Sequence, residues 1–288
     1  MENVIEIRNV HNEFKSFKIE DLSFNVKQGF VTGFIGANGA GKSTTIKILM
    51  NLIKPARGEV KVFGLDYVTH EKAIKERIGF VYDENVFYEQ ANLLDMKKII
   101  APAYKQWDDV LFKRFVDQFE LPLKKKMKTF SKGMKMKASL AFALSHQAEL
   151  IIMDEPTSGL DPVFRRELLD LLHEQMLTGE KTVFFSSHIT TDLDRFADYI
   201  TFIQNGKLVF SKEFYKIEEE YAIVKGSNEL LDRDTEKAFI SVRKANTGFE
   251  ALTNNRATVK QVFGSNVMLE KATLEDIMYF TKRGLVNA

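Results

Sequence analysis

The chain has 288 residues, of which 44% are hydrophobic and 28% are charged, and its formal net charge is +1. This balance is ordinary for a globular protein of one large or two modest domains, and the near-neutral charge argues against a protein built mainly to bind nucleic acid. The absence of cysteine excludes a disulfide framework or a thiolate site and fits a reducing cytoplasm best. The first ten residues lack the pattern of a signal peptide, and no apolar run is long enough to span a membrane.

The N-terminal half is predicted to contain short strands, one helix and then a helical block. Residues 4–10 and 19–35 alternate or run apolar in short segments, as strands do. The segment Lys42–Ile53 has helix-forming composition and stops before Pro55. Residues 84–145 are predicted to be strongly helical. Within them, apolar side chains recur at helical spacing at Val110, Leu111, Phe115, Val116 and Phe119.

The second half alternates strands with a helix and then changes character. Buried strands are predicted at 149–154 and 181–187, separated by an amphipathic helix at 165–177. This alternation predicts an α/β fold with a mostly parallel core sheet that is covered on both faces. All five prolines lie at or before Pro162, so the segment from about residue 215 onward contains none. We therefore expect a main domain at 1–215 and a small C-terminal region at 216–288.

The stretch from Gly36 to Ser43 reads GANGAGKS and matches the phosphate-loop pattern G-x-x-x-x-G-K-S. Its glycines let backbone N–H groups converge on phosphate oxygens at a helix N-terminus. Lys42 is expected to reach the β- and γ-phosphates and Ser43 to ligate Mg²⁺. An incidental glycine turn would match by chance in on the order of one in a hundred chains of this length. The predicted ATP-binding residues here are Gly36, Ala37, Asn38, Gly39, Ala40, Gly41, Lys42, Ser43 and Thr44.

A second motif, LIIMDEPTSGLD, runs from Leu150 to Asp161. A buried strand that delivers a carboxylate to its C-terminal end suits a crevice for a metal and a nucleotide. We expect Asp154 to hold Mg²⁺ through water and Glu155 to act as general base on the attacking water. The alternative is that Asp154 and Glu155 are two surface acids after a strand. The phosphate loop upstream, in a fold that alternates strands and helices, argues against this alternative.

These motifs, in this order, resemble the nucleotide-binding subunit of an ABC transporter over roughly residues 3–215. The resemblance implies a P-loop NTPase cassette with an antiparallel β subdomain beside the parallel core, a helical subdomain at about 84–145 and a small C-terminal extension. It also implies ATP and Mg²⁺ as cofactors and ATP hydrolysis as the activity. The implied partners are a membrane permease and an identical or related second cassette, with the chain bound peripherally at the cytoplasmic face of the membrane.

The stretch TFSKGMKMK, Thr129–Lys137, occupies the place of the LSGGQ-type signature of that family. Ser131 and Gly133 are retained, whereas Lys132 replaces a glycine and Met134 a glutamine. The resemblance implies that Ser131 and Gly133 meet the γ-phosphate held by the opposite subunit, at the N-terminus of their helix. The alternative is an ordinary helix cap.

The other family positions follow in the expected order. The resemblance implies that Asp161 lies at the dimer interface and that His188 contacts the γ-phosphate, although an isolated histidine after a strand is usually structural. Phe14 matches the aromatic position that stacks on adenine, with Phe17 as its rival. Asp83 stands where the family has a glutamine that ligates Mg²⁺ and senses the membrane subunit; a carboxylate can replace that ligand, and the alternative is an exposed acidic loop.

Within the family, the resemblance is to exporter subunits of Gram-positive bacteria that handle antimicrobial or toxin peptides, including exporters of phenol-soluble modulins. This resemblance rests on stretches such as QWDDVLFKRFVDQFEL and DEPTSGLDPVFRREL. We expect an ATP-hydrolysing subunit that powers export of peptides or other amphipathic molecules. One alternative is an ABC-type ATPase that acts without a permease, and a second is a chain that binds ATP without hydrolysis. The chain has one phosphate loop and no sustained heptads, which argues against an ATPase without a permease. The presence of Glu155 and His188 argues against a chain that binds ATP without hydrolysis.

Overall fold

The computed structural model of the chain describes residues 2–82, 87–177 and 179–287. The described chain divides into two compact units, residues 1–189 with 201–211, and residues 190–200 with 212–288. The sequence-based division at 215/216 did not assign residues 190–200 to the C-terminal unit. Among the described residues, no helix combines the length and the apolar character needed to cross a membrane.

The core of the first unit is a sheet with the strand order β10-β9-β3-β8-β7-β6. The run from β3 to β6 is parallel, as predicted. Every residue of β7 and β8 is buried, which is why these strands read as continuous apolar runs rather than alternating ones. The bounds are β3 Val31–Ile35, β6 Ile78–Val81, β7 Leu150–Asp154, β8 Thr182–Ser187, β9 Tyr199–Gln204 and β10 Lys207–Glu213.

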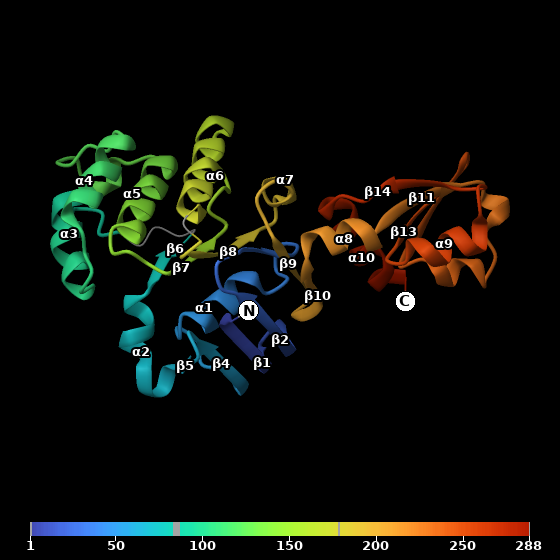
Figure 1. Cartoon of the computed structure of the whole chain (residues 1–288), viewed down its shortest axis with the longest axis horizontal. Helices are drawn as coiled ribbons and strands as arrows, with labels where there is room; N and C mark the ends of the chain where they lie inside the picture. Colours follow the sequence, from blue (N-terminus) through green and yellow to red (C-terminus); the bar gives the residue numbers. More distant parts are fainter. Residues whose placement is uncertain (1, 83–86, 178, 288) are drawn as a thin grey trace. The chain divides into compact units, whose positions relative to one another are not determined.

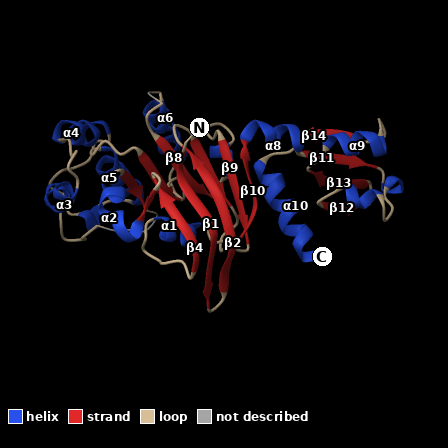
Figure 2. Cartoon of the chain, turned by 60° about the horizontal axis from the view of Figure 1, so that its bottom comes forward, coloured by secondary structure: helices blue, strands red, loops and turns tan. Residues whose placement is uncertain are grey.

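A second, antiparallel sheet has the order β2-β1-β4-β5, and β1, β2 and β4 lie side by side in Figure 2. Their alternating side chains bury one face, with Ile5, Ile19 and Leu22 fully enclosed, in a cluster that also contains Phe34 and Phe184 of the parallel sheet. The antiparallel subdomain implied by the family resemblance is confirmed. The bounds are β1 Asn3–Phe14, β2 Phe17–Lys27, β4 Arg57–Val62 and β5 Leu65–Asp66.

Two helices pack near these sheets. α1, Lys42–Leu49, is shorter than the predicted Lys42–Ile53. Asn51 has φ +55°, and asparagine adopts this left-handed conformation more readily than most residues, which ends the helix. α2, Tyr67–Glu76, begins at Asp66, whose carboxylate accepts the N–H of Val68.

The predicted helical block is confirmed for its described residues. It contains α3 Leu93–Ile100, α4 Asp109–Gln118 and α5 Lys132–Leu144, with short 3₁₀ turns at Ala101–Ala103 and Met127–Thr129. α5 contacts both α3 and α4, and the three helices stand together in Figure 1, coloured green. α6, Pro162–Met176, follows β7 and corresponds to the predicted amphipathic helix.

The C-terminal unit has its own antiparallel sheet, in the order β12-β13-β11-β14. Val224, Phe249, Val259 and Phe263 form its core between the sheet and α9. β12 starts at Ser241, after the 3₁₀ turn Thr235–Ala238. The bounds are α7 Thr190–Leu193, α8 Phe214–Glu220, β11 Ala222–Gly226, 3₁₀ Asn228–Leu230, β12 Ser241–Ala245, β13 Gly248–Thr253, α9 Arg256–Phe263, β14 Met268–Lys271 and α10 Leu274–Asn287.

Candidate active site

The phosphate loop, residues 36–43, joins the end of β3 to the start of α1. Gly41 has φ +110°, a conformation that strains any residue with a side chain. A Cβ at Gly41 would lie 2.7 Å from Cζ of Phe17, and a Cβ at Gly36 would lie 2.5 Å from the carbonyl oxygen of Ile203. The loop therefore needs glycine at both positions, because its backbone passes against neighbouring atoms without room for a side chain.

Lys42, the first residue of α1, has only 5% of its surface exposed. Its Nζ donates hydrogen bonds to the carbonyl oxygens of Gly36 at 2.7 Å and Ala37 at 3.4 Å. The same Nζ lies 3.0 Å from Oε1 of Glu155. A buried ammonium is stable only with such partners. The predicted phosphate-binding lysine is thus held at the loop by groups that a phosphate oxygen could replace.

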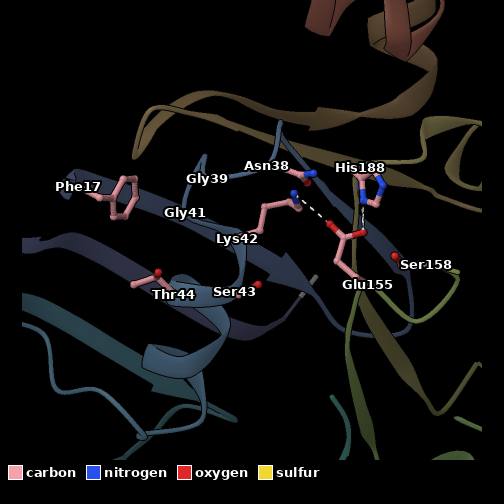
Figure 3. A pocket seen from close by; sticks show the side chains of 10 residues that line it. All are labelled: Phe17, Asn38, Gly39, Gly41, Lys42, Ser43, Thr44, Glu155, Ser158 and His188. Atoms are coloured by element: carbon pink, nitrogen blue, oxygen red, sulfur yellow. Dashed lines mark hydrogen bonds and ion pairs between the residues drawn. The ribbon is translucent and has the colours of Figure 1, made fainter. Parts of the chain in front are cut away.

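Glu155 follows β7 directly and contacts both other residues predicted to be catalytic (Figure 3). Its Oε2 lies 2.5 Å from Nδ1 of His188 and accepts the backbone N–H of His188 at 3.2 Å. The backbone N–H of Glu155 donates to Oγ of Ser186 in β8 at 3.0 Å. Its φ of +48° is uncommon for a residue other than glycine, and such strain is concentrated at functional sites. The carboxylate is therefore fixed between Lys42 and His188.

Asp154 and Ser43 are the predicted Mg²⁺ ligands that the structure describes. Asp154 is buried and its Oδ1 accepts a hydrogen bond from Oγ of Ser186 at 2.6 Å. Burial raises the pKa of Asp154, and hydrogen bonds from Ser186 and Ser43 oppose that rise. A hydroxyl beside a carboxylate suits Mg²⁺, which binds few protein ligands and completes its shell with water and phosphate oxygens. The described residues contain no three-residue His, Cys, Asp or Glu cluster that would cage a metal by itself.

Lys42, Ser43, Glu155 and His188 line a cavity of about 510 Å³, a size typical of ligand sites. In Figure 3 Phe17 lies on one side of the phosphate loop and His188 on the other. The sequence analysis did not assign Ser158, whose N–H donates to the carbonyl oxygen of Glu155 at 3.0 Å; its place three residues after Glu155 was the available signal. The lining residues are Phe17, Asn38, Gly39, Gly41, Lys42, Ser43, Thr44, Glu155, Ser158 and His188.

The two candidate adenine platforms are neighbours in the β1–β2 hairpin. Phe14 pairs with Phe17 in the strand register, and their ring centroids lie 6.2 Å apart with 21° between the ring planes. Phe17 is part of the cavity wall, whereas Phe14 is 38% exposed beside it. Adenine stacking on Phe14 stays a prediction from the sequence, whereas the position of Phe17 in the cavity wall favours its rival Phe17.

The residues predicted to meet a second cassette lie at the starts of two helices of this chain. Ser131 caps α5, because its Oγ accepts the N–H of Met134 at 3.2 Å, and Gly133 lies in the first turn of that helix. Asp161 caps α6 and accepts the N–H groups of Val163 at 3.1 Å and Phe164 at 3.0 Å. Contact of Ser131, Gly133 and Asp161 with a second cassette stays a prediction.

Asp83, the predicted coupling residue and Mg²⁺ ligand, lies outside the described residues, as does Glu84. The strand before them is described. β6 pairs in parallel with β7, with Val81 opposite Met153, so the chain leaves β6 at the sheet edge where Asp154 lies. Both roles of Asp83 stay predictions.

Comparisons with known proteins agree on one family. A family model described as "ABC transporter" matches residues 19–158. The bacitracin transport ATP-binding protein BcrA of Bacillus licheniformis is 38% identical over 214 residues, which cover 73% of this chain and 69% of the relative. The lantibiotic transport ATP-binding protein SrtF of Streptococcus pyogenes is 30% identical over 222 residues, which cover 73% and 91%. A solved ATP-binding subunit of an ABC transporter superimposes with a TM-score of 0.69 at 28% identity, covering 75% of this chain and 92% of that one.

Proposed function

The chain belongs to the ABC transporter family as an ATP-binding subunit, and we propose that it hydrolyses ATP at Glu155 to power a membrane exporter of peptides or other amphipathic molecules. Its family is one of ATPases that bind nucleotide. The observation that carries the residue assignment is the contact of Glu155 with both Lys42 and His188 in one cavity. A cation for phosphate, a carboxylate for water and a polar group beside it are what phosphoryl transfer requires.

The chemistry follows from charge and position. The triphosphate of ATP takes the place of Glu155 as partner of Lys42, and the loop N–H groups bind the remaining phosphate oxygens. Ser43 and Asp154 would hold Mg²⁺, and the bound ion would supply further neutralisation of the phosphates. The released carboxylate of Glu155 accepts a proton from the attacking water, whose oxygen bonds to the γ-phosphorus while the bond to the β–γ bridging oxygen breaks and ADP leaves. His188 stays beside that carboxylate and orients the water and the γ-phosphate.

A complete site uses two cassettes arranged head to tail. Ser131 is exposed at the N-terminus of α5, a helix long enough for its dipole to favour an anion there. In our proposal Ser131 and Gly133 of one cassette close over the nucleotide of its partner, with Asp161 at the interface. The partner is an identical or a related cassette. ATP binding closes the pair and hydrolysis releases it.

The cargo proposal draws on the relatives. Two of them are named for transport of bacitracin and of lantibiotics, which favours a peptide substrate for the exporter served by this chain. Phenol-soluble modulins stay a prediction within that class. The permease handles the cargo, and the chain binds it from the cytoplasmic face, with the Asp83 loop as the proposed coupling element.

An ABC-type ATPase without a permease is the alternative, and the transport names of these relatives weigh against it. The test is purification of the tagged chain from detergent-solubilised membranes. The proposal predicts an integral membrane protein in the complex and ATP hydrolysis that this protein stimulates. The same complex with Lys42→Ala should assemble without hydrolysing ATP. An active chain recovered without any membrane protein would favour the alternative.

A further inference from the structure

The segment from the end of α4 through α5 carries an unbalanced positive charge. Residues 121–148 contain seven lysines and no aspartate or glutamate, although the whole chain has a net charge of only +1. Four of these lysines are exposed and close together in the sequence, and we call them the lysine cluster: Lys124, Lys125, Lys126 and Lys128. Exposed lysines commonly serve solubility alone, so their surroundings decide whether these four have a further role.

The lysine cluster differs from its neighbours because it lacks acidic partners. Every lysine between residues 87 and 120 forms an ion pair, with Nζ at 2.7–3.6 Å from a carboxylate oxygen. The pairs are Lys97–Asp109, Lys98–Asp95, Lys105–Glu76 and Lys113–Asp117. Within the described part of the chain, no member of the lysine cluster forms an ion pair, and Lys126 donates only a hydrogen bond to Oε1 of Gln90 at 3.2 Å.

Backbone hydrogen bonds hold the lysine cluster against the turn at residues 88–91. Met127 is fully buried, and its N–H donates to the carbonyl oxygen of Ala91 at 2.8 Å. The N–H of Lys128 donates to the carbonyl oxygen of Glu89 at 3.0 Å. The side chain of Glu89 is exposed and forms no ion pair with a described lysine. The buried methionine therefore anchors a surface on which the ammonium groups stay without a carboxylate partner.

Apolar side chains are exposed beside the same turn. Tyr88, at the start of the turn, is 66% exposed, and Leu94, in the first turn of α3, is 36% exposed. Asn92, which caps α3, forms an antiparallel bridge with Lys126, so the start of α3 lies beside the lysine cluster. Lysine with tyrosine and leucine is typical of surfaces that lie at the headgroup level of a bilayer, where rings and alkyl stems contact acyl chains and ammonium groups contact phosphate.

We propose that the lysine cluster, with Tyr88 and Leu94, binds the anionic lipid headgroups of the membrane that holds the permease. The proposal rests on the proposed function for the presence of that membrane. It is carried by charge complementarity, because cations without partners gain most from a dense anionic surface, where each lysine contributes about fivefold to binding. Tyr88 follows the proposed coupling residue Asp83 closely in the sequence. The lipid site would give the cassette a second attachment beside the permease.

Flotation of the full chain with lipid vesicles tests the site without the permease. Vesicles with equal parts of phosphatidylglycerol and phosphatidylcholine should bind the parent at low salt, and binding should fall as added salt screens the charges. Vesicles of phosphatidylcholine alone should bind it far less. Replacing all four lysines of the cluster with glutamine should lower the partition coefficient on anionic vesicles at least about thirtyfold.

A control variant removes the same number of positive charges elsewhere and should stay within about threefold of the parent, because charges far from the bound surface are screened. Its four lysine-to-glutamine changes are at exposed positions outside the cluster: Lys54, Lys72, Lys260 and Lys282. Equal partitioning of the two variants would assign binding to overall charge and overturn the site. A parent that did not float with anionic vesicles, or that bound phosphatidylcholine equally well, would also overturn it.

Two further measurements separate the lipid site from other contacts. Tyr88→Ala should weaken binding to anionic vesicles by about threefold at low and high salt alike, since apolar contact is not screened, and an unchanged partition coefficient would contradict the apolar part of the site. A cluster variant that partitioned like the parent but no longer copurified with the permease would make the surface a protein contact and overturn the proposal. If the parent copurified with no membrane protein, the proposed function would fail, whereas the vesicle result would stand.

Discussion

Nζ of Lys42 lies 3.0 Å from Oε1 of Glu155, and 5% and 11% of the two side chains are exposed. The proposed phosphate-binding cation and the proposed general base therefore neutralise each other before nucleotide arrives. Oε2 of the same carboxylate contacts Nδ1 of His188. Binding of ATP must exchange the carboxylate for phosphate oxygens as partner of Lys42, and this exchange frees Glu155 to act on water.

Replacing Lys42 tests the phosphate loop. Lys42→Ala removes the charge that neutralises the phosphates and should lower kcat for ATP by about a hundredfold or more. The substitution lies at a helix start, so the circular dichroism spectrum should stay that of the parent. Lys72→Ala, on the exposed side of α2, is the matched control. Hydrolysis at the parent rate would exclude Lys42 from the site.

The ion pair between Lys42 and Glu155 predicts an effect on binding alone. In Glu155→Gln the amide cannot neutralise Lys42, so phosphate no longer competes with a carboxylate for the ammonium. Isothermal titration with ADP should show binding about threefold to tenfold tighter, equivalent to ~1 kcal/mol. Affinity equal to that of the parent, or weaker, would mean that the pair does not oppose nucleotide binding.

Adenine stacking should separate Phe17 from Phe14. Because Phe17 lines the cavity and aromatic stacking contributes about 1–3 kcal/mol per base, Phe17→Ala should raise KM for ATP by about fivefold or more with kcat nearly unchanged. Phe14→Ala should raise KM less, through its contact with the Phe17 ring. Steady-state kinetics of both variants decide the order, and a larger KM effect at Phe14 would make it the platform.

His146 predicts a pH dependence of stability. Its ring is buried and stacks on Tyr104 with centroids 3.8 Å apart, and burial lowers the pKa of His146 from 6.5 to about 4. Because the pKa of His146 is lower in the folded state than in the unfolded state, folding favours the neutral form of its ring. Stability is retained above the unfolded pKa and falls as the pH decreases from 6.5 toward 4.

Between pH 7 and pH 5 this histidine should cost about 2 kcal/mol of unfolding free energy. The measurement is urea unfolding of the parent and of His146→Gln at both pH values, followed by fluorescence of Trp107, the single tryptophan. The glutamine variant should lose correspondingly less stability over the same interval. Identical pH dependence in the two proteins would rule out this role for His146.

The sequence predicted the parts of the fold that local patterns determine. β7 and β8 follow from apolar runs that are buried on both faces, and the phosphate loop follows from glycines whose positions exclude a side chain. The predicted end of α1 was wrong, because Asn51 adopts a left-handed conformation that ends the helix well before Pro55. Asparagine permits that conformation without requiring it, so the sequence alone did not fix the boundary.

Contacts between distant segments were beyond sequence reasoning. Ser131 and Gly133 could be placed by motif, but the approach of the start of α5 to the segment before α6, where a Cβ on Gly133 would lie 4.0 Å from Cδ2 of Leu160, depends on tertiary packing. The position of Phe17 in the cavity wall likewise depends on the side of the hairpin that faces Gly41. In each case the deciding contact joins residues far apart in the chain, for which no local pattern exists.

The central claim is that the carboxylate of Glu155 activates the water that attacks ATP, and single-turnover hydrolysis in the exporter complex tests it most directly. Glu155→Gln keeps the size of the side chain and should bind Mg²⁺-ATP while hydrolysing it about a hundredfold or more slowly than the parent, since general-base catalysis contributes factors of this order. Glu219→Gln, on exposed α8 surface, should hydrolyse ATP like the parent. A Glu155→Gln complex that cleaved bound ATP at the parent rate would contradict the account.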